Sequence, residues 1–375
     1  MHLPIFKMER FQSLWENIVE YNLAESGVKP FKLKEIIEMT NSYELLKNLK
    51  LGYNQTNGSE KLRSLISEMY EESTLENVLV TNGSAEANFL SIFSLLNKGD
   101  EAIIMLPNYM QIWNLAKGLG CKVRALWLKE EHRKKWFIDI EKLKSMVSKS
   151  IKLIALCNPN NPTGAIIKEK DIKAIIEIAE DNGSWILSDE VYRGTEFNED
   201  SSQTLWGKYD KTIIVSGLSK AYGLPGIRIG WVVSEKKLIK KLWSYHDYTT
   251  IAPSCISDFI AQRILESNIR LKILQRTKNI LKSNLKILDE WIRKNNKVFS
   301  YTPPEATAVA FIKQKLGMSS LDFCKKLLRE KNVLILPSEY FGMKGYIRIG
   351  YGQEQKYLKN GLEKISEFLN NFLNF

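Results

Sequence analysis

One lysine, Lys220, lies in a segment whose neighbours suit carbonyl chemistry. Residues 216–231 read Ser-Gly-Leu-Ser-Lys-Ala-Tyr-Gly-Leu-Pro-Gly-Ile-Arg-Ile-Gly-Trp, so small residues flank the lysine and Arg228 follows eight positions later. Two apolar runs, 212–215 and 227–233, predict buried strands on either side. Because only a neutral amine attacks a carbonyl, we expect this lysine to have a lowered pKa and to form a Schiff base. From this stretch alone, an ordinary surface lysine in a loop is the alternative.

Polar residues also follow three other apolar runs, at the strand ends where open parallel sheets bind ligands. Thr81-Asn82-Gly83-Ser84-Ala85 follows the first and opens a helix, whose free amides can hold a phosphate. The second precedes a turn-rich cluster at 158–164, Asn-Pro-Asn-Asn-Pro-Thr-Gly. The third precedes Asp189, and a buried carboxylate there needs a cationic partner. A plain strand-to-helix turn and a solvated helix cap are the alternatives for the first and third sites.

The elements that must position these residues alternate along the chain. Seven runs predict strands, at 78–80, 101–106, 123–128, 151–157, 185–188, 212–215 and 227–233. Helical patterns lie between several of them, at 85–96, 109–119, 140–147 and 169–181. This alternation predicts an α/β fold with a mostly parallel seven-stranded sheet between helices.

The pattern changes beyond residue 251. Long helical stretches between 256 and 295 precede short strand patterns near 308–312, 333–336 and 346–349, followed by a final helix. A smaller α+β domain is therefore predicted. We expect residues 1–45 to form an N-terminal arm and part of the small domain, residues 46–275 the large domain, and residues 276–375 the small C-terminal domain.

The composition is that of an ordinary globular protein, with 44% hydrophobic and 26% charged residues among 375. No apolar run reaches the roughly 18–20 residues that span a bilayer, and the first residues lack the pattern of a signal peptide. The four cysteines lie far apart without the spacing of a zinc site or a disulfide framework. We therefore expect no metal, no membrane association and a cytoplasmic location.

The formal net charge of +11 comes largely from lysines spread along amphipathic helical stretches. The chain has no arginine-rich tail and no basic segment interleaved with aromatic residues. Nucleic-acid binding is therefore not expected. A positive field would favour anionic ligands such as phosphorylated cofactors.

The motifs at 158–164, at 189–192 (Asp-Glu-Val-Tyr) and at 219–231, in this order, resemble those of the class I/II aminotransferases. These are fold type I enzymes related to aspartate aminotransferase, and they depend on pyridoxal 5′-phosphate. The resemblance extends from about residue 51 to the region of Arg348. It implies a pyridoxal-phosphate enzyme that moves an amino group from an amino acid to a 2-oxo acid by a ping-pong mechanism.

The resemblance assigns roles around the cofactor ring. Lys220 matches the lysine that holds the cofactor as an internal aldimine and then moves the proton as general base and acid. Asp189 matches the acid that keeps the pyridine nitrogen protonated. Asn161 and Tyr192 match the hydrogen-bond donors to the phenolic oxygen, and Tyr109 matches the aromatic residue that stacks on the ring.

Other matched residues concern the cofactor phosphate. Arg228 matches its charge partner, Gly83, Ser84 and Ala85 match the cup at a helix terminus, and Ser219 is a hydroxyl contact. Tyr53 resembles a residue that reaches the phosphate of the neighbouring subunit, which implies a homodimer with composite active sites.

The substrate carboxylate is expected to meet Arg348 together with Asn161, with Gly27 approaching from the N-terminal arm. One position departs from the family pattern. The hydroxyl residue usual three positions before the lysine is Gly217 here, with Ser216 one position earlier. Either the loop shifts so that Ser216 substitutes, or one hydrogen bond worth about 1 kcal/mol is missing.

Two other functions compete with transamination. A lyase or cyclising enzyme would use the same cofactor site, and the shared motifs do not separate it from an aminotransferase. A transcription regulator with an aminotransferase-like domain would need a DNA-binding domain before residue 51, where the chain has too few residues and no notable basic charge.

Overall fold

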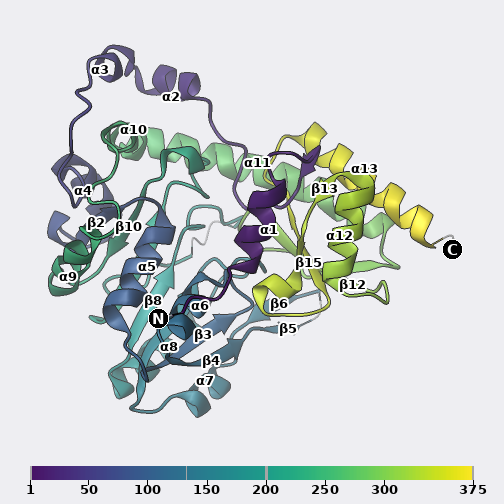
Figure 1. The fold of residues 1–375 in the computed structure, drawn as a ribbon, viewed down its shortest axis with the longest axis horizontal. Helices are drawn as coiled ribbons and strands as arrows, with labels where there is room; N and C mark the ends of the chain where they lie inside the picture. The colour runs from purple at the N-terminus through teal and green to yellow at the C-terminus, as the bar shows by residue number, and fades with distance from the viewer. Residues whose placement is uncertain (1, 132, 199–201, 374–375) are drawn as a thin grey trace.

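A seven-stranded sheet forms the centre of the protein, whose computed structural model describes residues 2–131, 133–198 and 202–373 (Figure 1). The strand order is β2-β10-β9-β8-β7-β3-β4, and only β10 runs antiparallel to its neighbours. The strands span β2 (Val78–Thr81), β3 (Glu101–Leu106), β4 (Lys122–Trp127), β7 (Ile151–Cys157), β8 (Trp185–Asp189), β9 (Thr212–Gly217) and β10 (Gly230–Val233). The predicted α/β fold with a mostly parallel seven-stranded sheet is confirmed.

Helices cover both faces of this sheet, because apolar side chains of its buried strands project from both faces and must be covered. In β2, Leu79 packs into one core, whereas Val78 and Val80 pack into the other. The first core also contains side chains from α5 (Ser84–Leu95), α6 (Gln111–Gly118) and α9 (Lys236–His246). The second contains side chains from α4 (Glu60–Ser67), α7 (Ile140–Met146), α8 (Glu169–Asn182) and α10 (Cys255–Leu265).

A smaller α+β unit follows, as expected from the change of pattern. Its antiparallel sheet has the order β11-β12-β15-β14. The strands are β11 (Phe299–Tyr301), β12 (Val309–Gln314), β14 (Leu336–Pro337) and β15 (Tyr346–Gly350), and the helices are α12 (Ser320–Lys331) and α13 (Gln355–Leu373). The long helix α11 (Ser267–Lys294) joins the units, because its first half packs into the large core and its second half into the small one.

The N-terminal arm lies against the small unit. It contains α1 (Lys7–Trp15) and β1 (Tyr21–Asn22), which pairs in parallel with β13 (Val333–Leu334). The run expected as one strand at 333–336 is therefore divided between two sheets. The amide of Gly350 donates to the carbonyl of Leu23 at 2.7 Å. A Cβ on Gly350 would lie 1.9 Å from the carbonyl oxygen of Glu25, so glycine lets the arm pack flush on β15.

Two short helices, α2 (Leu33–Thr40) and α3 (Tyr43–Lys47), follow the arm at the edge of the molecule (Figure 1). Helix α3 buries none of its residues within this chain. The remaining elements are β5 (Lys129–Glu131), β6 (Lys135–Phe137) and the 3₁₀ turns η1 (Leu75–Asn77), η2 (Pro225–Ile227) and η3 (Ser338–Phe341). The boundaries expected for the three domains stay a prediction.

The local predictions differ from the structure in two places that affect the site. The run expected as a strand at 227–233 starts with the turn η2, and β10 begins only at Gly230. Pro225 suits the first position of such a turn, and Arg228 has a φ of 51°, which breaks the extended conformation. The helix expected from residue 109 begins at Gln111, which leaves Tyr109 in the preceding loop. Helix α4 begins directly after Ser59, whose side chain accepts from the amide of Leu62 and so caps the helix.

Candidate active site

A cavity of about 290 Å³ lies at the carboxyl ends of β7, β8 and β9, next to the N-terminus of α5. Its lining combines most of the residues singled out from the sequence: Ser84, Ala85, Tyr109, Asn161, Asp189, Tyr192, Ser219, Lys220 and Arg228. Residues of the arm close it from the other side, among them Glu9 and Glu25. A larger cavity of about 530 Å³, between β6 and α8, contains neither Lys220 nor Asp189.

Lys220 follows β9 in the loop that the sequence predicts, and its Nζ lies 3.2 Å from Oε1 of Glu25. Burial alone would lower the pKa of this lysine, but the charge of Glu25 and its hydrogen bond raise it, and the net shift is upward. The expectation of a lowered pKa is therefore wrong for the protein without cofactor. The reason is a carboxylate from the arm, whose own pKa falls to about 2 beside Lys220.

Asp189 ends β8 and is 8% exposed. Its carboxylate accepts from Nδ2 of Asn88 at 3.1 Å and from the amide of Val191 at 3.2 Å. No lysine or arginine forms an ion pair with it among the residues described. Burial raises its pKa to about 6, although the two hydrogen bonds act in the opposite direction. A buried carboxylate that lacks a cationic partner fits the protonated ring nitrogen of pyridoxal phosphate.

Tyr192 and Asn161 line the same cavity as Lys220. The hydroxyl of Tyr192 is buried and makes no hydrogen bond of normal geometry among the described residues, although the nearby Ser26 side chain acts on its pKa. Asn161 is 5% exposed, and its Oδ1 accepts from Nη1 of Arg348 at 3.1 Å. The Tyr109 hydroxyl donates to Glu9 at 2.9 Å, and its ring packs on Phe6 with centroids 4.9 Å apart. The Tyr192 hydroxyl differs from that of Tyr109, because a buried hydroxyl without such a partner indicates that a ligand supplies the partner.

The N-terminus of α5 forms a cup suited to a phosphate. Gly83 has a φ of 84°, and a Cβ there would lie 2.2 Å from Nη2 of Arg228, so the guanidinium packs directly on this glycine. Arg228 Nη1 donates to Oγ of Ser219 at 3.3 Å. The amides of Ser84 and Ala85 are among the first of the helix, which have no acceptor within it. Free amides and a guanidinium are the donors that a phosphate requires.

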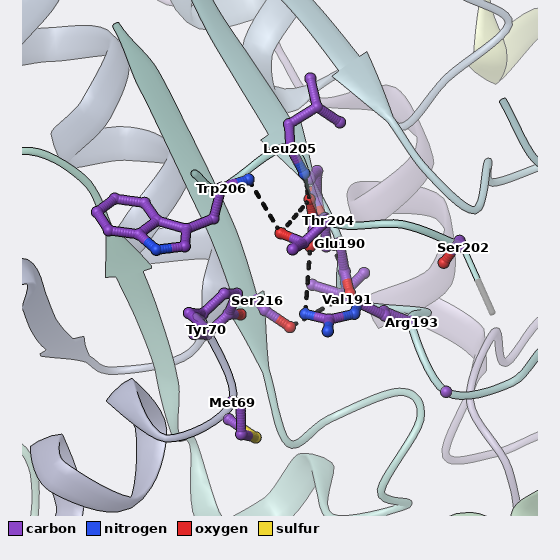
Figure 2. A network of polar contacts seen from close by, with 12 residues as sticks. Met69, Tyr70, Glu190, Val191, Arg193, Ser202, Thr204, Leu205, Trp206 and Ser216 are labelled. Atoms are coloured by element: carbon purple, nitrogen blue, oxygen red, sulfur yellow. Dashed lines mark hydrogen bonds and ion pairs between the residues drawn. The ribbon is translucent and has the colours of Figure 1, made fainter. Parts of the chain in front are cut away.

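Ser216 does not take the place of the hydroxyl missing at Gly217. Its hydroxyl donates to the backbone carbonyl of Glu190 at 3.2 Å, in a buried network outside the cavity lining (Figure 2). Gly217 itself leaves no room for a side chain, because a Cβ would lie 2.9 Å from the carbonyl oxygen of Ile229. Of the two alternatives drawn from the sequence, the structure favours the missing hydrogen bond.

The same network fixes the chain that follows Asp189. The carboxylate of Glu190 accepts from the Thr204 hydroxyl and from the Leu205 amide, both at 3.1 Å (Figure 2). Arg193 lies 3.8 Å from the other carboxylate oxygen of Glu190. Glu190 is 1% exposed, so these contacts hold a buried charge immediately next to Asp189 in sequence. The network thereby anchors the end of β8.

Four residues predicted from the sequence lie outside the cavity lining, and one of them is Gly83, on which the Arg228 guanidinium packs. Arg348, on β15, is 1% exposed and donates to Asn161 and to the carbonyl of Ala24. Gly27 lies beside Lys220, where a Cβ would be 3.8 Å from the lysine Cδ. Tyr53 is 90% exposed and does not line the cavity of its own chain.

Two residues that were not predicted, Asn88 and Glu25, hydrogen-bond to the charged groups of the site. Asn88 follows Ser84 by four positions, and helical spacing placed it on the face of α5 that turns to Asp189, so the sequence carried a usable signal. Glu25 contacts Lys220 across 195 positions of sequence, and nothing in its local pattern announces that contact.

Comparisons with known proteins agree with this arrangement. Residues 20–365 match the family model for aminotransferase class I and II. The (5-formylfuran-3-yl)methyl phosphate transaminase of Methanocaldococcus jannaschii is 30% identical over 87% of this chain and 86% of its own length. An aspartate aminotransferase of Sulfurisphaera tokodaii is 28% identical over 85% of this chain and 82% of its own. A crystal structure of a PLP-dependent aminotransferase from Streptococcus suis is 37% identical, with a TM-score of 0.92 over 99% of both chains.

The fold and the site define a pyridoxal-phosphate enzyme of fold type I. The chain belongs to the aminotransferase class I and II family. It is accordingly an aminotransferase that uses pyridoxal phosphate, with an amino acid and a 2-oxo acid as substrates. Within the described residues, no helix is long and apolar enough to cross a membrane, and no group of metal-ligating side chains is arranged to hold a metal ion.

Proposed function

We propose that Lys220 is the residue on which this transamination depends. The observation that carries the proposal is that Lys220, Asp189, Tyr192 and Arg228 line one cavity at the strand ends. When bound, pyridoxal phosphate supplies the electron sink that stabilises negative charge at the substrate α-carbon. Lys220 holds the cofactor aldehyde, and its amine, once free, moves the proton at that α-carbon.

The other residues divide binding between cofactor and substrate. Asp189 pairs with the ring nitrogen and keeps it protonated, while the hydroxyl of Tyr192 and the amide of Asn161 donate to the phenolic oxygen. Arg228, Ser219 and the amides at the start of α5 hold the phosphate, with Tyr109 against the ring. Arg348 and Asn161 bind the substrate carboxylate, and the absence of a side chain at Gly27 leaves room beside Lys220.

The substrate carboxylate reaches Arg348 only if the arm moves. The guanidinium of Arg348 is engaged by the carbonyl of Ala24, and Glu25 lies against Lys220. A substrate that brings a carboxylate to Arg348 and an amine to the Lys220 end replaces both arm contacts. Substrate binding and displacement of the segment around Glu25 are therefore coupled, because the same contacts are exchanged in both.

The test is an absorbance titration of the protein loaded with pyridoxal phosphate. We expect single amino acids to replace the visible band of the bound cofactor with a near-ultraviolet band, and a 2-oxo acid to restore it. Lys220→Ala abolishes both changes, whereas the exposed Lys297→Ala behaves as wild type. A Lys220→Ala protein that still cycles contradicts the assignment. Release of ammonia without that cycle supports the lyase or cyclase alternative instead.

We also infer that the active unit is a homodimer in which Tyr53 reaches the phosphate of the neighbouring subunit. Two observations support this inference. Tyr53 is 90% exposed in its own chain, and α3 buries nothing while Tyr43, Leu45 and Leu51 stand exposed nearby. Apolar side chains gathered on such a segment indicate a protein contact.

A cytoplasmic location fits the four cysteines, all of them free thiols.

A further inference from the structure

Three carboxylates of the N-terminal arm line the cavity that contains Lys220: Glu9, Glu16 and Glu25. The carboxylate of Glu9 accepts from the Tyr109 hydroxyl at 2.9 Å, and that of Glu25 pairs with Lys220 at 3.2 Å. Glu16 has no ion pair and no side-chain hydrogen bond among the described residues. The mouth of the active site therefore carries more negative charge than its own side chains neutralise.

These carboxylates act on one another. Burial raises the pKa of Glu16, and the charges of Glu25 and then of Glu9 raise it further. Like charges held close together are unfavourable unless a cation arrives between them, and the effect is stronger where the carboxylates are partly buried, as Glu16 and Glu25 are. These carboxylates matter for the site because they lie close to one another at the cavity, and not because acidic residues are numerous in the arm.

The cations already at the site have other partners in the proposed function. Arg228 binds the cofactor phosphate, Arg348 binds the substrate carboxylate, and Lys220 holds the cofactor. Asp189 is balanced by the ring nitrogen. Once these pairs form, Glu25 loses its lysine, and the arm carboxylates remain as the charges without a partner.

Two of these carboxylates, Glu9 in α1 and Glu16 directly after it, lie on one face together with Gln12. Glu9, Gln12 and Glu16 follow one another at intervals of three and four positions, and all three line the cavity. Gln12 is only 8% exposed, but its side-chain amide makes no hydrogen bond within the described residues and is open to the cavity that it lines. A largely buried glutamine whose amide is left free toward the cavity, between two carboxylates, is an independent sign that a polar ligand group occupies this place.

We propose that the amino acid substrate has a cationic side chain, an ammonium or a guanidinium, which binds between Glu9 and Glu16 with Gln12 as a further acceptor. This inference rests on the proposed function and names its substrate class. A carboxylate side chain would meet three like charges at the same place and be rejected. The positive charge of the substrate also compensates for the loss of the Glu25–Lys220 pair.

The test compares donors that differ only in the terminal charge. Lysine, ornithine and arginine are measured in the absorbance half-reaction against norleucine, which has the length of lysine without its ammonium, and against glutamate. We expect kcat/KM for the best basic donor to exceed that for norleucine by about tenfold or more. Equal rates with norleucine, or a preference for glutamate, overturn the inference. If no donor changes the spectrum, the proposed function itself fails.

Variants at Glu16 locate the effect. Glu16→Gln should lower the ratio of lysine to norleucine by about tenfold, and Glu16→Lys should shift preference toward glutamate. The exposed Glu20, which does not line the cavity, provides the matched control Glu20→Gln, and its ratio should stay at the wild-type value.

A binding measurement complements the rates. The dissociation constant of α-methyl-lysine, which has no α-proton to lose, should rise by the same factor in Glu16→Gln as kcat/KM for lysine falls. An unchanged ratio and an unchanged dissociation constant in Glu16→Gln would show that this face does not read the side chain.

Discussion

Asp189 carries a buried charge for which the described part of the chain provides two neutral donors and no ion-pair partner. Asn88 and the amide of Val191 satisfy its oxygens, but burial still raises its pKa to about 6. The protein without cofactor therefore holds a proton on this carboxyl at a pH where an exposed aspartate has lost it. A buried carboxyl of this kind becomes charged when a cation pairs with it, and here the cation is expected to come from the ligand.

This residue gives a pH dependence with a defined sign. In the unfolded chain Asp189 titrates near its ordinary value, so between about pH 4 and pH 6 the native state binds more protons than the unfolded state. As the pH rises through that window, the free energy of unfolding of the cofactor-free protein should fall, by about 3 kcal/mol for two pKa units. Urea unfolding of wild type and Asp189→Asn from pH 4 to pH 7 measures the difference.

Asp189→Asn removes the titration but keeps a side chain of the same shape. Its unfolding free energy should lack the extra decline, so the two pH profiles should diverge as pH rises. Parallel profiles would show that Asp189 is not the titrating group. Bound pyridoxal phosphate should reverse the trend for wild type, because the ring nitrogen then stabilises the charged carboxylate.

At the scale of elements, the phosphate cup depends on how closely α5 approaches β10. A Cβ on Gly230 would lie 2.3 Å from the amide nitrogen of Ser84 and 2.4 Å from the carbonyl carbon of Gly83. Both neighbours are backbone atoms, which cannot rotate away as a side chain can. The glycine at the start of β10 therefore sets the position of the helix amides that face Arg228.

Gly230→Ala should accordingly displace the N-terminus of α5. We expect a loss of about 1–3 kcal/mol of stability, together with weaker binding of pyridoxal phosphate. Pyridoxal, which lacks the phosphate, should bind with a nearly unchanged dissociation constant. Gly226→Ala is the control, because a Cβ there meets nothing within 4 Å. Equal weakening for both ligands would place the damage outside the cup.

The large unit was predictable because its signals are local. Buried parallel strands produce apolar runs, and the turns that end them need glycine, proline and asparagine, so the sheet and the strand-end cluster follow from the sequence. Helical spacing also places Asn88 beneath Asp189. The placement of Lys220 in a loop after β9 belongs to the same class of inference.

The arm was not predictable in this way. Glu25 approaches Lys220, and Ala24 approaches Arg348, only because β1 adds to β13 more than 300 positions later in the chain. No periodicity records such a contact. This omission made the expected pKa of Lys220 wrong in direction, because the carboxylate that raises it comes from the arm. The catalytic roles themselves stay predictions until the variants are measured.

At the scale of the whole molecule, the exposed segment between α3 and α4 allows a test of the composite site. Lys220→Ala should be inactive, and Tyr53→Ala should be strongly impaired when pyridoxal phosphate is limiting, since each damages every site of its own homodimer. In a hybrid dimer, one site combines the intact lysine of one subunit with the intact tyrosine of the other. Mixing after reversible dissociation should therefore restore about a quarter of wild-type activity.

Size measurements accompany that mixing experiment. Sedimentation should show a dimer for wild type and for both variants, so a failure to complement cannot be assigned to dissociation. Full activity of Tyr53→Ala alone, or no recovery in verified hybrids, would remove Tyr53 from the neighbouring site. Recovery with monomeric protein would contradict the shared site altogether.

The flush packing of the arm on β15 has a consequence for amide hydrogen exchange. The amide of Leu23 donates to Leu334 at 2.9 Å, that of Gly27 to Glu25 at 2.7 Å, and that of Gly350 to Leu23 at 2.7 Å. Any ligand that reaches both Lys220 and Arg348 displaces the arm around Glu25, and it therefore changes how strongly these few amide protons are protected from exchange. Deuterium uptake at residues 22–29 thus becomes a reporter of site occupancy that needs neither turnover nor colour.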